Sequence, residues 1–278
     1  WTTTDVPGYF RPPAKNFLTL DHYTGQLTWD YPEQQGIFNI AIEIDEYRKD
    51  RSTGKPYRIG YVIRDMQIIV QSCDNHPPVI DSLHDTCVEA GKNIDLHYTI
   101  YATDRDSNPN PDVVTMTATG GPFLQSVSPA TLLPDPAVGA TSVSARFYWK
   151  IACEHIRKEP YRVVVRAVDD DPVTPLSDIK YFDIRVVGPA PKNLQSAALG
   201  GTVTITWEKP DCSNARGYLV YRRVDSSHWN HDYCETGIPG YVGFRLIDTI
   251  TNPAQTSFLD NGNGAGLSAG IEYCYRVT

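Results

Sequence analysis

Short segments in which apolar and polar residues alternate recur along most of the chain. They are rich in Val, Ile, Tyr and Thr, and stretches of Gly, Pro, Asn and Asp separate them. A period of two places successive side chains on opposite faces of a strand, so the pattern predicts an all-β chain of sandwiches. The nearest approach to a helical segment is residues 153–160, which Pro160 ends after one turn. The alternating segments are residues 38–44, 94–102, 144–152, 161–168, 181–187, 202–207 and 218–224.

Two proline-marked stretches divide this strand pattern. Residues 73–80 (CDNHPPVI) and residues 186–194 (VVGPAPKNL) each follow one strand and lead into another. Such stretches are typical of domain boundaries. We therefore predict three tandem domains, with limits at residues 1–75, 76–188 and 189–278.

The composition argues against two classes of function. The 278 residues carry a net charge of −8 and contain no basic run, so we expect no nucleic-acid partner. Apolar runs of about 18 residues are absent from the sequence, so we expect no membrane insertion.

Six cysteines are spread widely along the chain, and none forms a C-x-x-C pair, so neither a redox motif nor a zinc ribbon is indicated. Wide spacing in a β-rich chain favours disulfides in an oxidising compartment, and buried free thiols are the alternative. The cysteines are Cys73, Cys87, Cys153, Cys212, Cys234 and Cys274.

The last predicted domain resembles a fibronectin type III domain. A Pro-rich first strand precedes a strand ending in Trp207, and the chain continues with GYLVYRR and closes on residues 267–278 (LSAGIEYCYRVT). The resemblance implies that Tyr273, Tyr275 and Val277 alternate as inward residues of a strand. It also implies that the last strand of such a fold would follow Thr278.

The first predicted domain resembles the later half of a cadherin-like or bacterial immunoglobulin-like domain. The resemblance rests on residues 18–46, with the turn LDHYTGQL followed by the strand GIFNIAI. It implies a partial domain whose earlier strands would precede Trp1. The middle domain, residues 76–188, is expected to be a complete immunoglobulin-like or cadherin-like sandwich.

The combination of motifs resembles one group of large proteins. IGYVIRDMQIIV, CDNHPPVI, CVEAG, GGPF, IRKEPYRVVV and VVGPAPKNL together resemble the repeated ectodomain of gliding-motility-associated surface proteins of Bacteroidetes. The resemblance implies type IX secretion and a location that is extracellular, at the cell surface or associated with the bacterial outer membrane.

Two motifs match catalytic or metal-binding patterns, but we predict that both have only structural roles. GLSAG, residues 266–270, matches a nucleophile elbow, but a strand-like segment rather than a helix follows it. His228, His231, Asp232 and Cys234 could offer zinc ligands, but their spacing matches no defined site. We expect a loop packed by Trp229 and Tyr233, with Cys234 in a disulfide.

Acidic residues of the middle domain are the main candidates for a site. In a Greek-key sandwich the loops after residues 94–102 and after residues 161–168 lie at one pole, where the linker also arrives. Clustered Asp and Asn oxygens are suitable ligands for Ca²⁺. Asp and Asn are also favoured in ordinary turns, where their side chains form hydrogen bonds with the backbone. The candidate calcium ligands are Asp74, Asn75, Asp104, Asp106, Asp169 and Asp171, and Asp170 lies among them.

This arrangement resembles the calcium junctions of cadherins. CDNHPP resembles their linker, and the DRD of residues 104–106 resembles their Asp-x-Asp loop. Cadherin junctions also draw acids from the preceding domain, where only Asp30 and Glu33 are available here. A calcium site and ordinary turns therefore remain the two explanations for these acidic loops, and we expect no other cofactor.

Two disulfides are predicted from the expected positions of the cysteines. Cys87 and Cys153 are both expected at the pole opposite the acids and form the favoured pair, while Cys212 with Cys234 is a second pair. Cys73 and Cys274 would then have partners in sequence beyond residues 1–278.

Together these features predict a non-catalytic segment of a bacterial surface or secreted protein. We expect it to act as a structural spacer that contacts other domains of the same chain, with adhesion or contact with a surface protein or glycan as further roles. The alternative is a carbohydrate-binding or accessory module of a larger secreted hydrolase.

Overall fold

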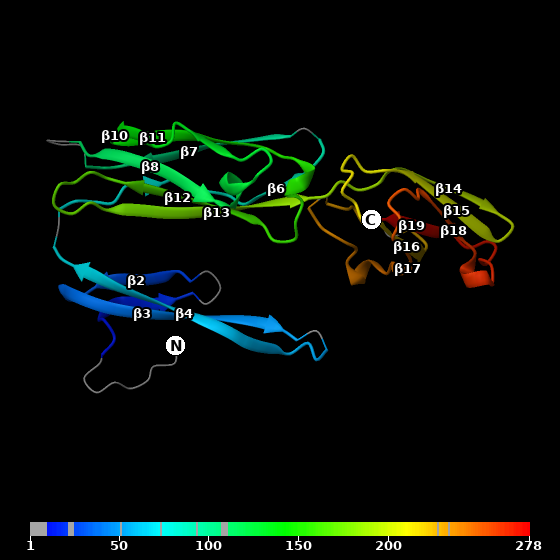
Figure 1. The fold of residues 1–278 in the computed structure, drawn as a ribbon, viewed down its shortest axis with the longest axis horizontal. Helices are drawn as coiled ribbons and strands as arrows, with labels where there is room; N and C mark the ends of the chain where they lie inside the picture. Colours follow the sequence, from blue (N-terminus) through cyan, green and yellow to red (C-terminus); the bar gives the residue numbers. More distant parts are fainter. Residues whose placement is uncertain are drawn as a thin grey trace. The chain divides into compact units, whose positions relative to one another are not determined.

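The computed structural model consists of strands joined by turns and short 3-10 helices (Figure 1). The predicted all-β class is therefore confirmed. The chain forms two compact units, residues 1–74 and 75–278. The described residues are 10–21, 25–50, 52–72, 74–92, 94–106, 111–226, 228–232 and 234–278.

The first unit contains two antiparallel hairpins. Strands β1 (Ala14–Leu20) and β2 (Leu27–Pro32) form one, and the longer strands β3 (Gly36–Lys49) and β4 (Pro56–Val70) form the other. The hairpins meet where Trp29 of β2 packs edge-on against Phe38 of β3, with ring centroids 4.9 Å apart. Among the described residues of this unit, Pro12 and Ile40 are buried, and many apolar side chains of β3 and β4 are exposed.

The turn between β3 and β4 is held by a carboxylate, and this gives a pH-dependent prediction. Asp50 Oδ1 accepts hydrogen bonds from the backbone N–H of Ser52 at 2.7 Å and of Thr53 at 3.0 Å. The Ser52 hydroxyl, followed by these N–H groups, lowers the pKa of Asp50 from 3.8 to about 2. Because the folded pKa is lowered, the stabilisation is present above pH 3.8 and is lost as the pH falls through about 2.

A carboxyl NMR titration of the chain is expected to show Asp50 titrating near pH 2. Ser52→Ala should raise this pKa, since the hydroxyl contributes the largest lowering, while Ser52→Thr should retain much of the effect. A titration of wild-type Asp50 at its ordinary value of 3.8 would contradict the turn geometry.

The second unit begins with a sandwich of two sheets (Figure 1). One sheet has the order β5-β7-β11-β9, and the other has the order β10-β8-β12-β13-β6, in which β13 and β6 are parallel. Two such sheets with this strand order are the arrangement of an immunoglobulin-like sandwich. The strands are β5 (Val79–Ile80), β6 (Thr86–Glu89), β7 (Asp95–Thr103), β8 (Val113–Gly120), β9 (Thr131–Leu133), β10 (Ala137–Ala140), β11 (Ser142–Lys150), β12 (Tyr161–Val168) and β13 (Ser177–Val187).

The core of this sandwich follows from the alternation in its strands. Trp149 on β11 is fully buried and packs on Tyr161 and on His155, at centroid distances of 4.9 and 4.7 Å. His155, in the 3-10 helix η2 (Cys153–His155), has both ring nitrogens engaged: Nδ1 accepts from the N–H of Ala152, and Nε2 lies 2.7 Å from the carbonyl of Val127. One donor and one acceptor fit the neutral imidazole, so this buried histidine is a satisfied core residue.

The second unit ends with a smaller sandwich. Its sheets have the orders β14-β15-β18 and β17-β16-β19, which is the arrangement of a fibronectin type III sandwich as far as these strands go. Trp207 and Tyr218 pack edge-on in its core at 5.2 Å, with Val220 fully buried beside them. The strands are β14 (Lys192–Leu199), β15 (Thr202–Glu208), β16 (Tyr218–Val224), β17 (Arg245–Ile250), β18 (Ser257–Asp260) and β19 (Tyr273–Val277). Short 3-10 helices lie at η1 (Gly121–Leu124), η3 (Gly240–Val242) and η4 (Gly262–Gly264).

Within the described part of the chain, no helix has the length and the apolar character that crossing a membrane would require.

Candidate functional site

Carboxylates from two loops, β7–β8 and β12–β13, gather at one pole of the middle sandwich. Asp104 and Asp106 follow β7, Asp112 immediately precedes β8, and Asp169 and Asp171 follow β12. The backbone brings the two ends of the β7–β8 loop together, because the N–H of Asp104 donates to the carbonyl of Thr141 at 2.7 Å and the N–H of Thr141 donates to the backbone carbonyl of Asp112 at 3.0 Å.

Three of these carboxylates form a tight cluster. Oxygen atoms of Asp104, Asp106 and Asp112 all lie within 4.8 Å of one another. Asp104 is only 7 % exposed; its Oδ1 accepts the N–H of Asp106 at 2.9 Å, and its buried Oδ2 has no hydrogen-bond partner among the described residues. Asp112 was not among the ligands expected from the sequence, because it stands alone at the start of a strand.

The electrostatic state of the cluster reflects this crowding. Burial, followed by the neighbouring carboxylates of Asp104, Asp169, Asp106 and Asp171, raises the pKa of Asp112. The negative charges of four aspartates thus act on the carboxyl group of a fifth, Asp112, at this pole.

Two residues that lead into the sandwich, Asn75 and His76, form hydrogen bonds with carboxylates of this pole. The carboxylate of Asp106 faces His76, whose backbone N–H and ring Nδ1 lie 2.6 and 2.8 Å from its two oxygens. These hydrogen bonds lower the pKa of Asp106. Asn75 Nδ2 donates to Asp169 Oδ2 at 3.0 Å and to the carbonyl of Thr174 at 2.9 Å.

The six expected calcium ligands thus fall into separate roles. Asp104 and Asp106 belong to the cluster. Asp169, 4 % exposed, accepts from Asn75 and from Leu176 N–H at 2.8 Å. Asp171 Oδ1 accepts the N–H groups of Val173 and Thr174, which is the geometry of an ordinary turn. Asp74 is exposed and belongs to the first unit.

Both disulfides join the middle sandwich to the last one, which corrects the predicted pairing. Cys87 on β6 pairs with Cys234, with Cα atoms 6.1 Å apart, and Cys153 in η2 pairs with Cys212, with Cα atoms 5.5 Å apart. The expected pairs Cys87–Cys153 and Cys212–Cys234 are therefore wrong, although all four cysteines are bonded. Cys274 forms no disulfide among the described residues, and Cys73 lies outside them.

Strand alternation explains why Cys87 does not reach Cys153. The next residue, Val88, is 6 % exposed and points into the core, so Cys87 faces away from it. Cys153 instead packs against the core of the middle sandwich. The partner of each cysteine comes from beyond the linker of residues 186–194, in the last sandwich.

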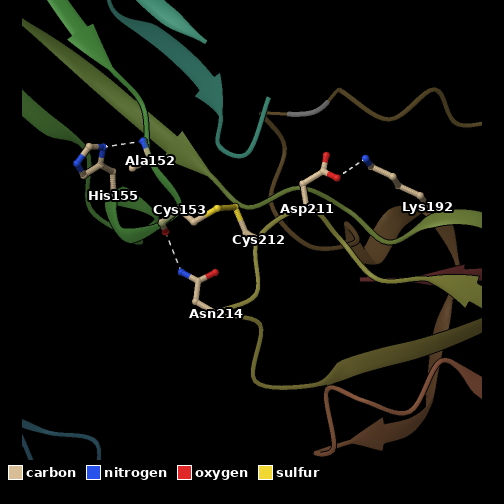
Figure 2. Close-up of a disulfide and its surroundings, with 7 residues drawn as sticks. All are labelled: Ala152, Cys153, His155, Lys192, Asp211, Cys212 and Asn214. Carbon is tan, nitrogen blue, oxygen red and sulfur yellow. Dashed lines mark hydrogen bonds and ion pairs between the residues drawn. A yellow bond between two sulfur atoms is a disulfide. The ribbon is translucent and has the colours of Figure 1, made fainter. Parts of the chain in front are cut away.

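Figure 2 shows the surroundings of the Cys153–Cys212 disulfide. Cys212 is 3 % exposed and lies in the core cluster of the middle sandwich, although its own chain segment belongs to the last one. Asn214 Nδ2 donates to the carbonyl of Cys153 at 2.8 Å, and Lys192 forms an ion pair with Asp211 (Figure 2). Gly91, at φ +85°, leaves the space for this approach, because a Cβ there would lie 3.0 Å from the Cβ of Asp211.

The two catalytic or zinc-like motifs take structural roles. Ser268 lies in the turn before strand β19, so no helix follows it as a nucleophile elbow would need. Cys234 is consumed by its disulfide, and Asp232 accepts the N–H of Cys234 at 3.0 Å. Trp229 packs against His231 and under Arg276 of β19, as expected of a packed loop, while Tyr233 lies outside the described residues.

No protein-family model matches the chain, and no curated protein matches it. Among solved structures it is similar to domains A168–A170 of titin, with 12 % identity, a TM-score of 0.29 and coverage of 95 % of this chain and 77 % of that one. It is also similar to a two-domain fibronectin type III segment of chicken tenascin, with 13 % identity, a TM-score of 0.28 and coverage of 73 % and 90 %.

A third similar structure is the sialic acid binding region of a Streptococcus sanguinis adhesin. Its identity is 16 % and its TM-score 0.29, over 51 % of this chain and 46 % of that chain. Superpositions at these scores are too loose to assign a family or a ligand. The class of the molecule, tandem immunoglobulin-like and fibronectin type III-like sandwiches, therefore rests on the strand order given above.

Proposed function

We propose that residues 75–278 act as a stiff, non-catalytic spacer in a bacterial surface or secreted protein. The observation that carries this proposal is that two disulfides, Cys87–Cys234 and Cys153–Cys212, cross between the same two sandwiches. A segment of this kind would hold other domains of the same chain at a fixed distance.

Two covalent links restrict a domain pair far more than a linker does. A single bond would still let the sandwiches swivel about it, but two bonds that start from β6 and from η2 oppose rotation about either one. The burial of Cys212 in the core of the middle sandwich adds a packed contact to the covalent one. A mobile junction would not need these links, because the default for tandem domains is relative motion.

The chemistry of the links supports an extracellular location. Disulfides persist in oxidising compartments and are rare where thiols are kept reduced. The acids at the pole of the middle sandwich accept hydrogen bonds from turns, as Asp169 and Asp171 do, which is a structural use. We also propose that the spacer supports adhesion, or contact with a surface protein or glycan.

The distance distribution between the two sandwiches tests this proposal. Spin labels would be attached through noncanonical amino acids at positions 138 and 259, whose side chains are 58 % and 54 % exposed on β10 and β18. Pulsed electron resonance on the oxidised full chain should give one narrow distance. Removing both disulfides with Cys87→Ser, Cys234→Ser, Cys153→Ser and Cys212→Ser should broaden it.

Cys274→Ser is the matched control, since this thiol forms no disulfide among the described residues, and it should leave the distribution narrow. Non-reducing peptide mapping of the same sample establishes that both disulfides are formed. A broad distribution in the fully oxidised chain would refute the spacer.

A further inference from the structure

We propose that the cluster of Asp104, Asp106 and Asp112 binds one divalent cation, Ca²⁺, within the middle sandwich. This site uses residues of one sandwich only. It therefore differs from a junction site that would take ligands from Asp74 or Asn75, and it does not depend on the proposed spacer role.

The first argument is the unpartnered oxygen of Asp104. The side chain is more than nine-tenths buried, and no described group donates to its Oδ2. A buried carboxylate oxygen without a partner is costly, and native structures nearly always satisfy such atoms. A cation held by this oxygen would supply the missing interaction, which a plain turn does not.

The second argument is the spacing of the three carboxylates. Ca²⁺ binds oxygen at 2.3–2.6 Å, so two of its ligands can be up to about 5 Å apart. The oxygens of Asp104, Asp106 and Asp112 lie within 4.8 Å of one another, which lets one ion reach all three. His76 does not prevent this, because a carboxylate has about four lone-pair sites and can accept from His76 while it binds a cation.

The third argument is the type of ligand. The cluster contains carboxylates and neither imidazole nor thiolate among its members, which favours a hard cation over zinc. Ca²⁺ completes a coordination shell of six to eight oxygens with bidentate carboxylates and water, and it tolerates irregular geometry. Mg²⁺ needs near-ideal octahedral geometry and gives up its water reluctantly, so it should bind more weakly here.

Calcium titration of the EDTA-treated, oxidised full chain tests the site. We expect one ion per chain in titration calorimetry, with a dissociation constant on the order of 10⁻⁴–10⁻³ M, the range of extracellular modules. Added Ca²⁺ should also raise the melting temperature of the second unit, because a ligand that binds only the folded state stabilises it. Mg²⁺ at the same concentration should give at most a small shift.

Two variants locate the ion. Asp112→Asn, in a half-buried position, should fold normally and weaken Ca²⁺ binding at least about tenfold, and Asp104→Asn should do the same. Glu46→Gln removes the same charge from an exposed position in the first unit and should leave binding unchanged. The site is refuted if the wild-type chain shows neither calcium heat nor a calcium-dependent melting shift, or if folded Asp112→Asn binds like the wild type.

Discussion

Removing the Cys153–Cys212 disulfide, by Cys153→Ala with Cys212→Ala, is expected to lower the free energy of unfolding of the second unit by about 4 kcal/mol. The two residues are separated by 59 positions, and a crosslink over a loop of that length removes much of the entropy of the unfolded chain. Hydrogen exchange at the amides of β12, compared between wild type and variant in the full chain, measures the loss.

The control for this experiment is Cys274→Ala, which should cost less than about 1 kcal/mol because it breaks no disulfide. Cys87→Ala with Cys234→Ala offers a second test. Its crosslink spans 147 positions, for which the same entropy treatment gives about 5 kcal/mol. Exchange in the Cys153/Cys212 variant as slow as in the Cys274 variant would mean that this crosslink does not stabilise the fold.

The second large effect is expected at a buried ion pair of the last sandwich. Asp260 on β18 is 4 % exposed and accepts two hydrogen bonds from Arg222 Nη1, at 2.8 and 3.0 Å, and one from the hydroxyl of Tyr275 at 2.9 Å. Arg222→Met would leave this carboxylate buried without its counter-charge. We expect a loss of about 3 kcal/mol, at the lower end for buried pairs because the Arg222 side chain is 27 % exposed.

A surface pair with similar geometry provides the comparison. Arg162 binds both oxygens of Asp183 at 2.9 Å, but its side chain is 45 % exposed. Arg162→Met should therefore cost less than about 1 kcal/mol in the same guanidinium denaturation experiment. Equal losses for the two variants would show that the burial of Asp260 does not determine the strength of the pair.

Much of the fold could be predicted from the sequence because strands leave a local signal. The alternating stretch 161–168 coincides with strand β12, whose Val163, Val165 and Ala167 are fully buried. The turns between such stretches carry Gly, Pro, Asn and Asp for reasons of backbone geometry. These signals predict the all-β class without any knowledge of which strands pair.

Pairings over long distances leave no such signal. The alternation of β6 shows that Cys87 and Val88 lie on opposite faces, but it does not show that Cys234 approaches from another sandwich. The assumption that each domain closes its own disulfides therefore gave the wrong partners. The pair Arg222–Asp260 was missed for the same reason, because the two residues are brought together by strands β16 and β18 of different sheets.

The acidic pole was predicted in outline and not in detail. The positions of Asp104 and Asp106 after a strand were sufficient to expect a cluster. The sequence could not show that Asn75 binds Asp169, nor that Asp112 joins the cluster at the start of β8. Which carboxylate bonds to a turn and which stays unpartnered depends on side-chain directions that only the folded loops determine.

The position of Cys212 limits how far the two sandwiches of residues 75–278 are interchangeable parts. Because this side chain completes the core of its neighbour, cutting the chain in the linker of residues 186–194 would open a hole in the middle sandwich and expose the thiol of Cys153. Recombination at this linker would therefore disrupt both halves. We expect such a pair to be exchanged or engineered as one block, despite the linker between its two sandwiches.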